Sequence, residues 1–192
     1  MSQESGKTVN GVRIALHPPG SARQRRTLDE RLRVRFPALV RPVGAAFLRL
    51  PPSWRLRRLM LARSILRAYA AANRRDFDLI LTAYDARLYE YHPSADLMPP
   101  DFEPVYHGHS GYLAFWRRWL DVFPDIRWDP EEILDLGNRA LVTTRQSGHG
   151  STSDIAVDER VFQLFTFRAG LVIRQEDFLD RAKALQAVEV SE

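Results

Sequence analysis

Two adjacent carboxylic acids, Glu176 and Asp177, lie in the stretch 171–179 near the C-terminus. Side chains alternate between the two faces of a β-strand, so we expect one carboxyl to point inward and the other outward. Apolar surroundings raise the pKa of a carboxyl, which suits it to act as a general acid or base. The alternative is that both groups lie in solvent or pair with Arg174 or Arg145.

Histidines are the second kind of candidate group. His92 closes a tyrosine-rich stretch and carries a side chain that titrates near neutral pH. His107 and His109 are two positions apart, which is weak spacing for metal ligands. We therefore predict no metal ion. We also predict no cofactor, because side chains alone can carry out proton transfer.

A cluster of aromatic residues recurs at helical spacing, with Phe115, Trp116, Trp119 and Phe123 as its members. Such spacing is more typical of a hydrophobic core than of a binding pocket. An individual indole N–H could still be presented to a ligand.

The sequence lacks the motifs of several enzyme classes. It has no glycine-rich phosphate loop, no nucleophile elbow and no zinc-protease helix. It has no cysteine, which excludes disulfides, thiolate zinc sites and cysteine nucleophiles. The glycines at 148 and 150 are most simply part of a hairpin turn.

The elements that must position these groups follow from capping and periodicity. Thr27 and Glu30 form a capping-box pattern, and Ser53 is expected to cap a long helix that reaches Asn73. Because the later strands are grouped rather than alternating with helices, the pattern predicts an α+β fold with a mostly antiparallel sheet. The other predicted elements are helices over 77–84, 111–123 and 180–188, and strands over 88–92, 126–136, 139–146, 156–168 and 171–179.

Charge is distributed unevenly along the chain. Residues 1–75 hold 17 basic against 3 acidic side chains, whereas residues 76–192 hold 11 against 21. We interpret this as a basic segment that pairs with the acidic part of its own chain or of a second copy. Contact of this segment with nucleic acid or an anionic membrane ranks last, because the helix over 54–73 carries many core-type residues.

The predicted organisation has three parts: a mobile tail over 1–25, a basic helical extension over 26–60 and a folded domain over 61–190. No apolar run is long enough to span a membrane. The N-terminus also lacks the apolar region of a secretory signal. These features favour a cytoplasmic location.

Several short stretches together resemble the SnoaL-like branch of the NTF2-like superfamily. The resemblance covers about two thirds of the chain and consists of many weak positions in the right order. It implies a cone built from a curved, mostly antiparallel sheet wrapped around helices, a pocket for a small molecule, and a homodimer. The stretches are Tyr106-His-Gly-His-Ser-Gly-Tyr112, Phe115-Trp116, Phe123-Pro124, Asp135-Leu-Gly-Asn-Arg139, Gly148-His-Gly150, Phe165-Thr-Phe-Arg-Ala-Gly170 and Asp180-Arg-Ala-Lys-Ala-Leu185.

The same resemblance bears on the chemistry. Ketosteroid isomerases of this superfamily use a tyrosine and two aspartates, and the matching positions here hold Ala68, His92 and Gln163. That activity is therefore not expected. SnoaL-type polyketide cyclases keep an aspartate on the last strand, and Asp177 matches it. The match implies that Gln163, Phe165, Phe167, Gln175, Asp177 and Leu179 point inward, with Arg174 and Glu176 outward.

Two hypotheses follow. In the first, the protein is a cofactor-independent enzyme that cyclises, isomerises, dehydrates or hydrates a cyclic, mostly apolar substrate. Asp177 would be the acid or base, His92 a second titrating group at the pocket mouth, and Gln163 and Gln175 would orient a carbonyl or hydroxyl. In the second, the domain is a non-catalytic ligand-binding or dimerisation module. The remaining predicted ligand-binding residues are Phe165, Trp116 and Tyr69.

Overall fold

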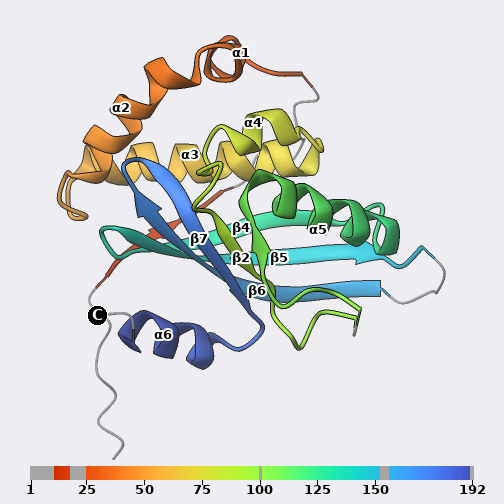
Figure 1. The fold of residues 1–192 in the computed structure, drawn as a ribbon. Coiled ribbons are helices and arrows are strands. Elements are labelled where there is room, and N and C mark those ends of the chain that lie inside the picture. The colour runs from red at the N-terminus through yellow and green to blue at the C-terminus, as the bar shows by residue number, and fades with distance from the viewer. Residues whose placement is uncertain (1–10, 18–24, 100, 152–155, 191–192) are drawn as a thin grey trace, which may run out of the picture.

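The computed structural model describes residues 11–17, 25–99, 101–151 and 156–190, which form one curved sheet with helices on both faces (Figure 1). None of the helices in these residues is long and apolar enough to cross a membrane. The helices are α1 (Leu28–Arg35), α2 (Pro37–Leu48), α3 (Arg55–Asn73), α4 (Phe77–Leu81), α5 (Gly108–Val122) and α6 (Arg181–Val190). The strands are β1 (Val12–Ala15), β2 (Glu90–His92), β3 (Tyr106–His107), β4 (Arg127–Asp135), β5 (Arg139–His149), β6 (Ala156–Arg168) and β7 (Leu171–Phe178).

The seven strands form a single sheet in the order β1-β4-β5-β6-β7-β2-β3. All neighbours pair antiparallel except β2 and β7, which run parallel. The expected α+β class with a mostly antiparallel sheet is therefore confirmed. The two-residue turn between β6 and β7 has positive φ at Ala169 and Gly170, a conformation typical of tight hairpins.

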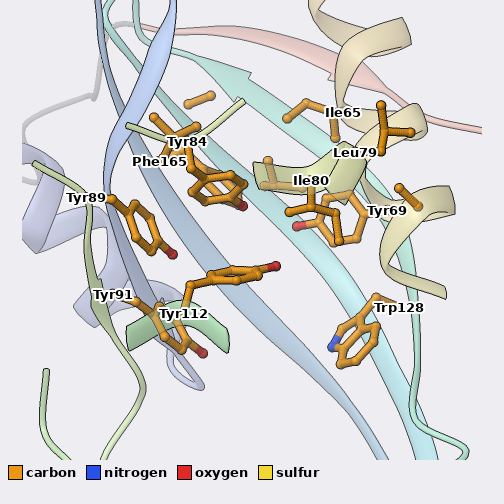
Figure 2. Packing of buried hydrophobic residues seen from close by; sticks show 14 of the residues in the cluster. Ile65, Tyr69, Leu79, Ile80, Tyr84, Tyr89, Tyr91, Tyr112, Trp128 and Phe165 are labelled. Carbon is orange, nitrogen blue, oxygen red and sulfur yellow. The ribbon is translucent and has the colours of Figure 1, made fainter. Parts of the chain in front are cut away.

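The sheet buries apolar side chains on both faces. On the inner face, α3, α4 and α5 cover a large cluster rich in tyrosine (Figure 2). On the outer face, α6 covers a smaller cluster that includes Phe162 and Leu164 of β6. Between these two residues, Gln163 points to the inner face, as the two-residue repeat of a strand requires.

A buried ion pair fixes the start of α3 to the sheet. The Arg57 guanidinium donates to both carboxylate oxygens of Asp135 at 2.7 Å. Both side chains are almost completely buried, and Arg57 also donates to the carbonyls of Leu48 and Leu50. The predicted domain boundary between residues 60 and 61 therefore falls inside a continuous helix that is already anchored at Arg57.

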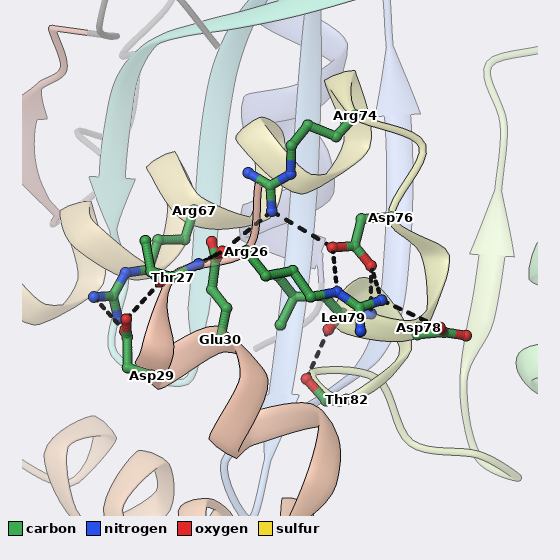
Figure 3. A network of polar contacts seen from close by, with 10 residues as sticks. All are labelled: Arg26, Thr27, Asp29, Glu30, Arg67, Arg74, Asp76, Asp78, Leu79 and Thr82. Atoms are coloured by element: carbon green, nitrogen blue, oxygen red, sulfur yellow. Dashed lines mark hydrogen bonds and ion pairs between the residues drawn. The ribbon is translucent and has the colours of Figure 1, made fainter. Parts of the chain in front are cut away.

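A network of ion pairs joins α1 to the region where α3 ends and α4 begins (Figure 3). Arg26 donates to Asp76 at 2.5 and 2.8 Å. In the predicted capping box, the Thr27 amide donates to Glu30 at 2.8 Å, and Arg74 lies 3.3 Å from the same carboxylate. The interpretation that the basic segment pairs with acidic groups of its own chain is thus confirmed for Arg26.

Residues 12–15, which were predicted to belong to a mobile tail, are ordered in the structure. These residues form β1, which pairs with β4 over Val12↔Asp135 to Ala15↔Glu132. The sequence did not indicate this strand, because a four-residue run is too short to show a clear alternation; its order comes from hydrogen bonding to a distant strand. The rest of the predicted tail at residues 1–10 and 18–24 lies outside the described residues.

The segment from Pro37 to Leu48 forms a regular helix, α2, although it contains Pro42 and Gly44. The helix packs tightly on the β6–β7 turn, where Gly170 has a φ of 82°. A Cβ on Gly170 would lie 2.6 Å from the backbone nitrogen of Ala45, so only glycine permits this approach. Tertiary contact therefore outweighs the weak helical propensity of α2.

Candidate functional site

A cavity of about 80 Å³ lies between α3, α4 and α5 and the inner face of β6 and β7. This volume is well above the ~15 Å³ that holds one water molecule, and below the ~150 Å³ of an apolar cavity that accepts benzene. Its walls are mostly aliphatic and aromatic, with Ile65 and Ile80 at one side and Trp116 and Trp128 at another. Some of these side chains are seen in Figure 2. The cavity is therefore suited to an apolar ligand and must widen to admit a ring system.

Gln163 and Gln175 provide the two amide groups of this cavity wall. Gln163 of β6 is paired in register with Asp177 of β7, and Gln175 lies two residues before Asp177. The two-residue repeat therefore brings all three side chains to the inner face. Glu176 points the other way and contacts Arg174 at 3.0 Å.

Asp177 is the centre of a hydrogen-bond network. Its carboxylate accepts from the Tyr91 hydroxyl at 2.9 Å, from the Gln175 amide at 3.0 Å and from the Gln163 amide at 3.1 Å to each oxygen. Burial of the carboxyl raises its pKa from the ordinary 3.8 to about 6, while the hydrogen bonds from Gln175, Tyr91 and Gln163 oppose this rise. Asp177 can therefore exchange a proton near neutral pH.

Tyrosine hydroxyls fix the orientation of the two amides. The oxygen of Gln163 accepts from Tyr69 at 2.5 Å, and the oxygen of Gln175 accepts from Tyr89 at 3.2 Å and Tyr84 at 3.4 Å. Each amide must then turn its NH₂ group toward Asp177. Burial raises the pKa of all three tyrosines well above 10, so they remain neutral donors.

The structure brings most of the predicted site residues together. Tyr69, Trp116, Gln163, Phe165 and Gln175 all line the cavity. Asp177 lies one hydrogen bond behind the two glutamine amides and is not itself part of the cavity wall.

His92 does not join this group, contrary to its predicted place at the pocket mouth. Its Nε2 lies 3.4 Å from Glu90, which is on the same face of β2. The intervening residue, Tyr91, takes the inward position and bonds to Asp177. The prediction for His92 was wrong because the resemblance placed His92, and not Tyr91, on the inner face of this three-residue strand.

The tyrosines that surround Asp177 were not among the predicted site residues. Tyr84 and Tyr89 lie in the segment between α4 and β2, Tyr91 is in β2, and Tyr112 is in α5. The rings of Tyr84 and Tyr89 meet edge to face at 4.6 Å. The only available signal was the alternation of tyrosines in the strand over 88–92, which places Tyr89 and Tyr91 on one face.

Within the residues that the structure describes, no group of three or more His, Asp or Glu side chains is arranged to hold a metal ion. In this part of the chain, the Trp116 indole N–H is buried and forms no well-aligned hydrogen bond, although it is close enough to the Tyr112 hydroxyl to oppose the rise of that group's pKa. Because Trp116 lines the cavity, this N–H is a donor for which a ligand oxygen would be a suitable acceptor.

Comparison with known proteins identifies the fold. Residues 65–175, more than half of the chain, match the family model of the SnoaL-like domain. No curated protein matches the chain significantly. These findings confirm the resemblance inferred from the sequence.

Solved structures of the same fold agree with this match. TerC, crystallised with polyporic acid, is 23% identical with a TM-score of 0.55, over 66% of this chain and 96% of TerC. An NTF2-like protein of unknown function from Burkholderia pseudomallei is 21% identical with a TM-score of 0.56, over 65% of this chain and 93% of that protein. IdmH from Streptomyces antibioticus, a candidate polyketide cyclase, is 15% identical with a TM-score of 0.53, over 67% of this chain and 97% of IdmH. At these identities the similarity shows the shared NTF2-like fold.

Proposed function

The chain belongs to the SnoaL-like domain family, and we propose that it binds a small, mostly apolar cyclic molecule and transfers a proton next to a carbonyl group of that molecule. One observation carries the proposal: the polar wall of an apolar cavity is backed by a carboxyl group whose pKa is raised to about 6. A carboxylate of this kind is ionised at neutral pH and is a stronger base than an ordinary aspartate.

The proposed step uses groups already in contact. The ligand displaces one of the amide contacts of Asp177, which keeps its hydrogen bond from Tyr91. Asp177 removes a proton from the carbon beside the carbonyl, and the electron pair of the broken C–H bond moves onto the carbonyl oxygen. Gln163 or Gln175 donates a hydrogen bond to that oxygen as it becomes negative. In a substrate with a C=C bond next to that carbon, return of the proton to the far carbon of this bond completes an isomerisation.

The ligand class is supported by the cavity and by the family. Trp116 and Trp128 meet edge to face at 4.9 Å and form an aromatic wall beside the glutamines. TerC, a protein of the same fold, was crystallised with a small molecule, polyporic acid. An aromatic wall with few polar groups favours a planar, apolar ligand that carries one or two oxygen atoms.

A second function, ligand binding without catalysis, is favoured by a different observation. Both oxygens of the Asp177 carboxylate are bonded to protein donors, and the residue lies behind the cavity wall. In this case Asp177 positions the two glutamines, and these recognise a ligand hydroxyl or carbonyl. The two functions share the same pocket and differ in whether the ligand reaches the carboxylate.

Hydrogen–deuterium exchange separates the two functions. We expect the protein in D₂O to exchange the protons beside the carbonyl of at least one compound in a panel of cyclic ketones and 1,3-diketones, measured by NMR. Asp177→Asn should lower the rate by a factor of about 10² to 10⁴, the usual contribution of a general base. The exposed Asp158, which pairs with Arg145, provides the matched control Asp158→Asn.

Ligand binding is measured in parallel by the fluorescence of Trp116 and Trp128, which line the cavity. Binding without exchange in the wild-type protein would favour the non-catalytic function. No binding and no exchange across the panel would contradict both. Equal exchange rates in the wild type and Asp177→Asn would show that the carboxyl is not the base.

A further inference from the structure

A group of large apolar side chains lies in solvent on the N-terminal extension. Five of them are on α1, α2 and the residue between them: Leu28 at 77% exposure, Leu32 at 57%, Phe36 at 48%, Leu39 at 73% and Val43 at 59%. Leu28 and Leu32 are four positions apart on α1, and so are Leu39 and Val43 on α2, so each pair lies on one face of its own helix. Figure 1 shows α1 and α2 as an outer layer beyond α3, and α2 reaches the sheet at the β6–β7 turn.

The exposed apolar surface continues past α2. Trp54, Leu56 and Leu59, at the connection to α3 and in its first turns, are each more than half exposed. In the described part of the chain, only one other large apolar residue is as exposed, namely Leu88. Exposed apolar side chains are therefore concentrated on the segment 28–59, where folding of the domain leaves them uncovered.

Arginines accompany these apolar residues. Arg31, Arg35, Arg41, Arg49 and Arg55 are all exposed. The acidic residues of the segment 25–63 are confined to its first helix at positions 29 and 30, and they pair with Arg67 of α3 and with Arg74 directly after α3. The segment therefore carries positive charge that its own carboxylates do not neutralise.

We propose that the outer face of the α1–α2 extension docks on the surface of an anionic phospholipid membrane. The leucines, Phe36 and Val43 would enter the boundary between headgroups and acyl chains, and the arginines would contact lipid phosphates. Trp54 fits the same interface, because indole rings prefer this depth. In this arrangement the protein lies on the membrane surface and does not cross the bilayer.

Charge favours lipid over the other occupants of such a face. In a symmetric dimer formed through this surface, each arginine-rich segment would meet an identical one, so like charges would oppose each other. A nucleic acid would pair with the arginines and leave Leu28 and Leu39 in water. An anionic membrane satisfies both the charge and the apolar side chains.

Co-sedimentation with vesicles tests the proposal. We expect the full chain to bind vesicles of phosphatidylcholine with phosphatidylglycerol, to bind pure phosphatidylcholine weakly, and to lose affinity as salt rises. The double variant Leu32→Glu with Leu39→Glu should bind at least about tenfold more weakly than the wild type. Arg31→Gln and Arg35→Gln should each weaken binding about fivefold. Leu88→Glu, at an equally exposed leucine elsewhere, is the control and should bind like the wild type.

Circular dichroism checks that each variant remains folded. We expect all of them to fold, because the substituted side chains are exposed. The proposal is overturned if the wild type binds neither kind of vesicle, or if Leu88→Glu weakens binding as much as the double leucine variant. A dimer in solution that the leucine substitutions dissociate would assign the face to a second copy. Binding to duplex DNA that depends on the arginines but not on the leucines would assign it to nucleic acid.

Discussion

Replacement of Asp177 by asparagine should change how stability depends on pH. Asparagine has nearly the same shape but no charge, so the substitution removes the cost of burying an ionised group. The carboxyl is enclosed by Tyr91, Gln163 and Gln175, and its pKa is raised from 3.8 to about 6. The comparison of the two proteins across pH isolates this one group, because all other ionisable groups are the same in both.

The sign and the size follow from the pKa. A carboxyl whose pKa is higher in the folded than in the unfolded protein stabilises the fold fully below 3.8, and this stability is lost as the pH rises through about 6. The full difference corresponds to about 3 kcal/mol, of which about 2 kcal/mol falls between about pH 4.5 and pH 7.5. The free energy of unfolding of the wild type, relative to Asp177→Asn, should decrease by this amount.

Urea unfolding followed by tryptophan fluorescence at several pH values measures this difference. Asp158→Asn is the control, because Arg145 lowers the pKa of Asp158 and the pH trend should be small and opposite in sign. The same free-energy difference between wild type and Asp177→Asn at every pH would refute the reasoning, since it would mean that water reaches the carboxyl and keeps its pKa ordinary.

Three further substitutions test the fold and the network. Arg57→Met leaves Asp135 buried and unpaired, so urea unfolding should show a loss of about 3–5 kcal/mol. Gly170→Ala pushes a Cβ against Ala45 and strains a φ of 82°, so α2 should loosen and limited trypsin digestion should cleave it faster than in the wild type. Tyr69→Phe leaves the oxygen of Gln163 without its donor and should destabilise the protein by about 1–3 kcal/mol in the same unfolding assay, without the pH trend of Asp177→Asn.

The main features of the fold could be predicted from short-range patterns. The strand over 156–168 was predicted with the bounds that the structure shows, because it is rich in β-branched and aromatic residues and the turn at Ala169-Gly170 limits it. The inward direction of Gln163 and Gln175 followed once the inner face of one strand was chosen, because side chains alternate between the two faces along both strands of the hairpin. The polar wall of the cavity could thus be predicted because Gln163 and Gln175 lie on long, regular strands.

The features that were missed depend on contacts between distant parts of the chain. Strand β1 is ordered by pairing with β4, more than a hundred residues later. His92 lies on a strand of three residues, where the alternation of Tyr89 and Tyr91 was the only indication of which side chains point inward. The hydrogen bonds that join Tyr84 and Tyr89 to Gln175 span more than eighty residues, so periodicity could not indicate them.

The rate of proton exchange as a function of pH tests the central claim most directly. With a cyclic ketone that the protein binds, the exchange rate in D₂O should rise with pH and level off above a midpoint near the pKa of Asp177, which is about 6. In Asp177→Asn the rise should disappear and the remaining rate should be at least about a hundredfold lower. A rate without this midpoint, or a profile that is unchanged in Asp177→Asn, would contradict the account of Asp177 as the base in an apolar pocket.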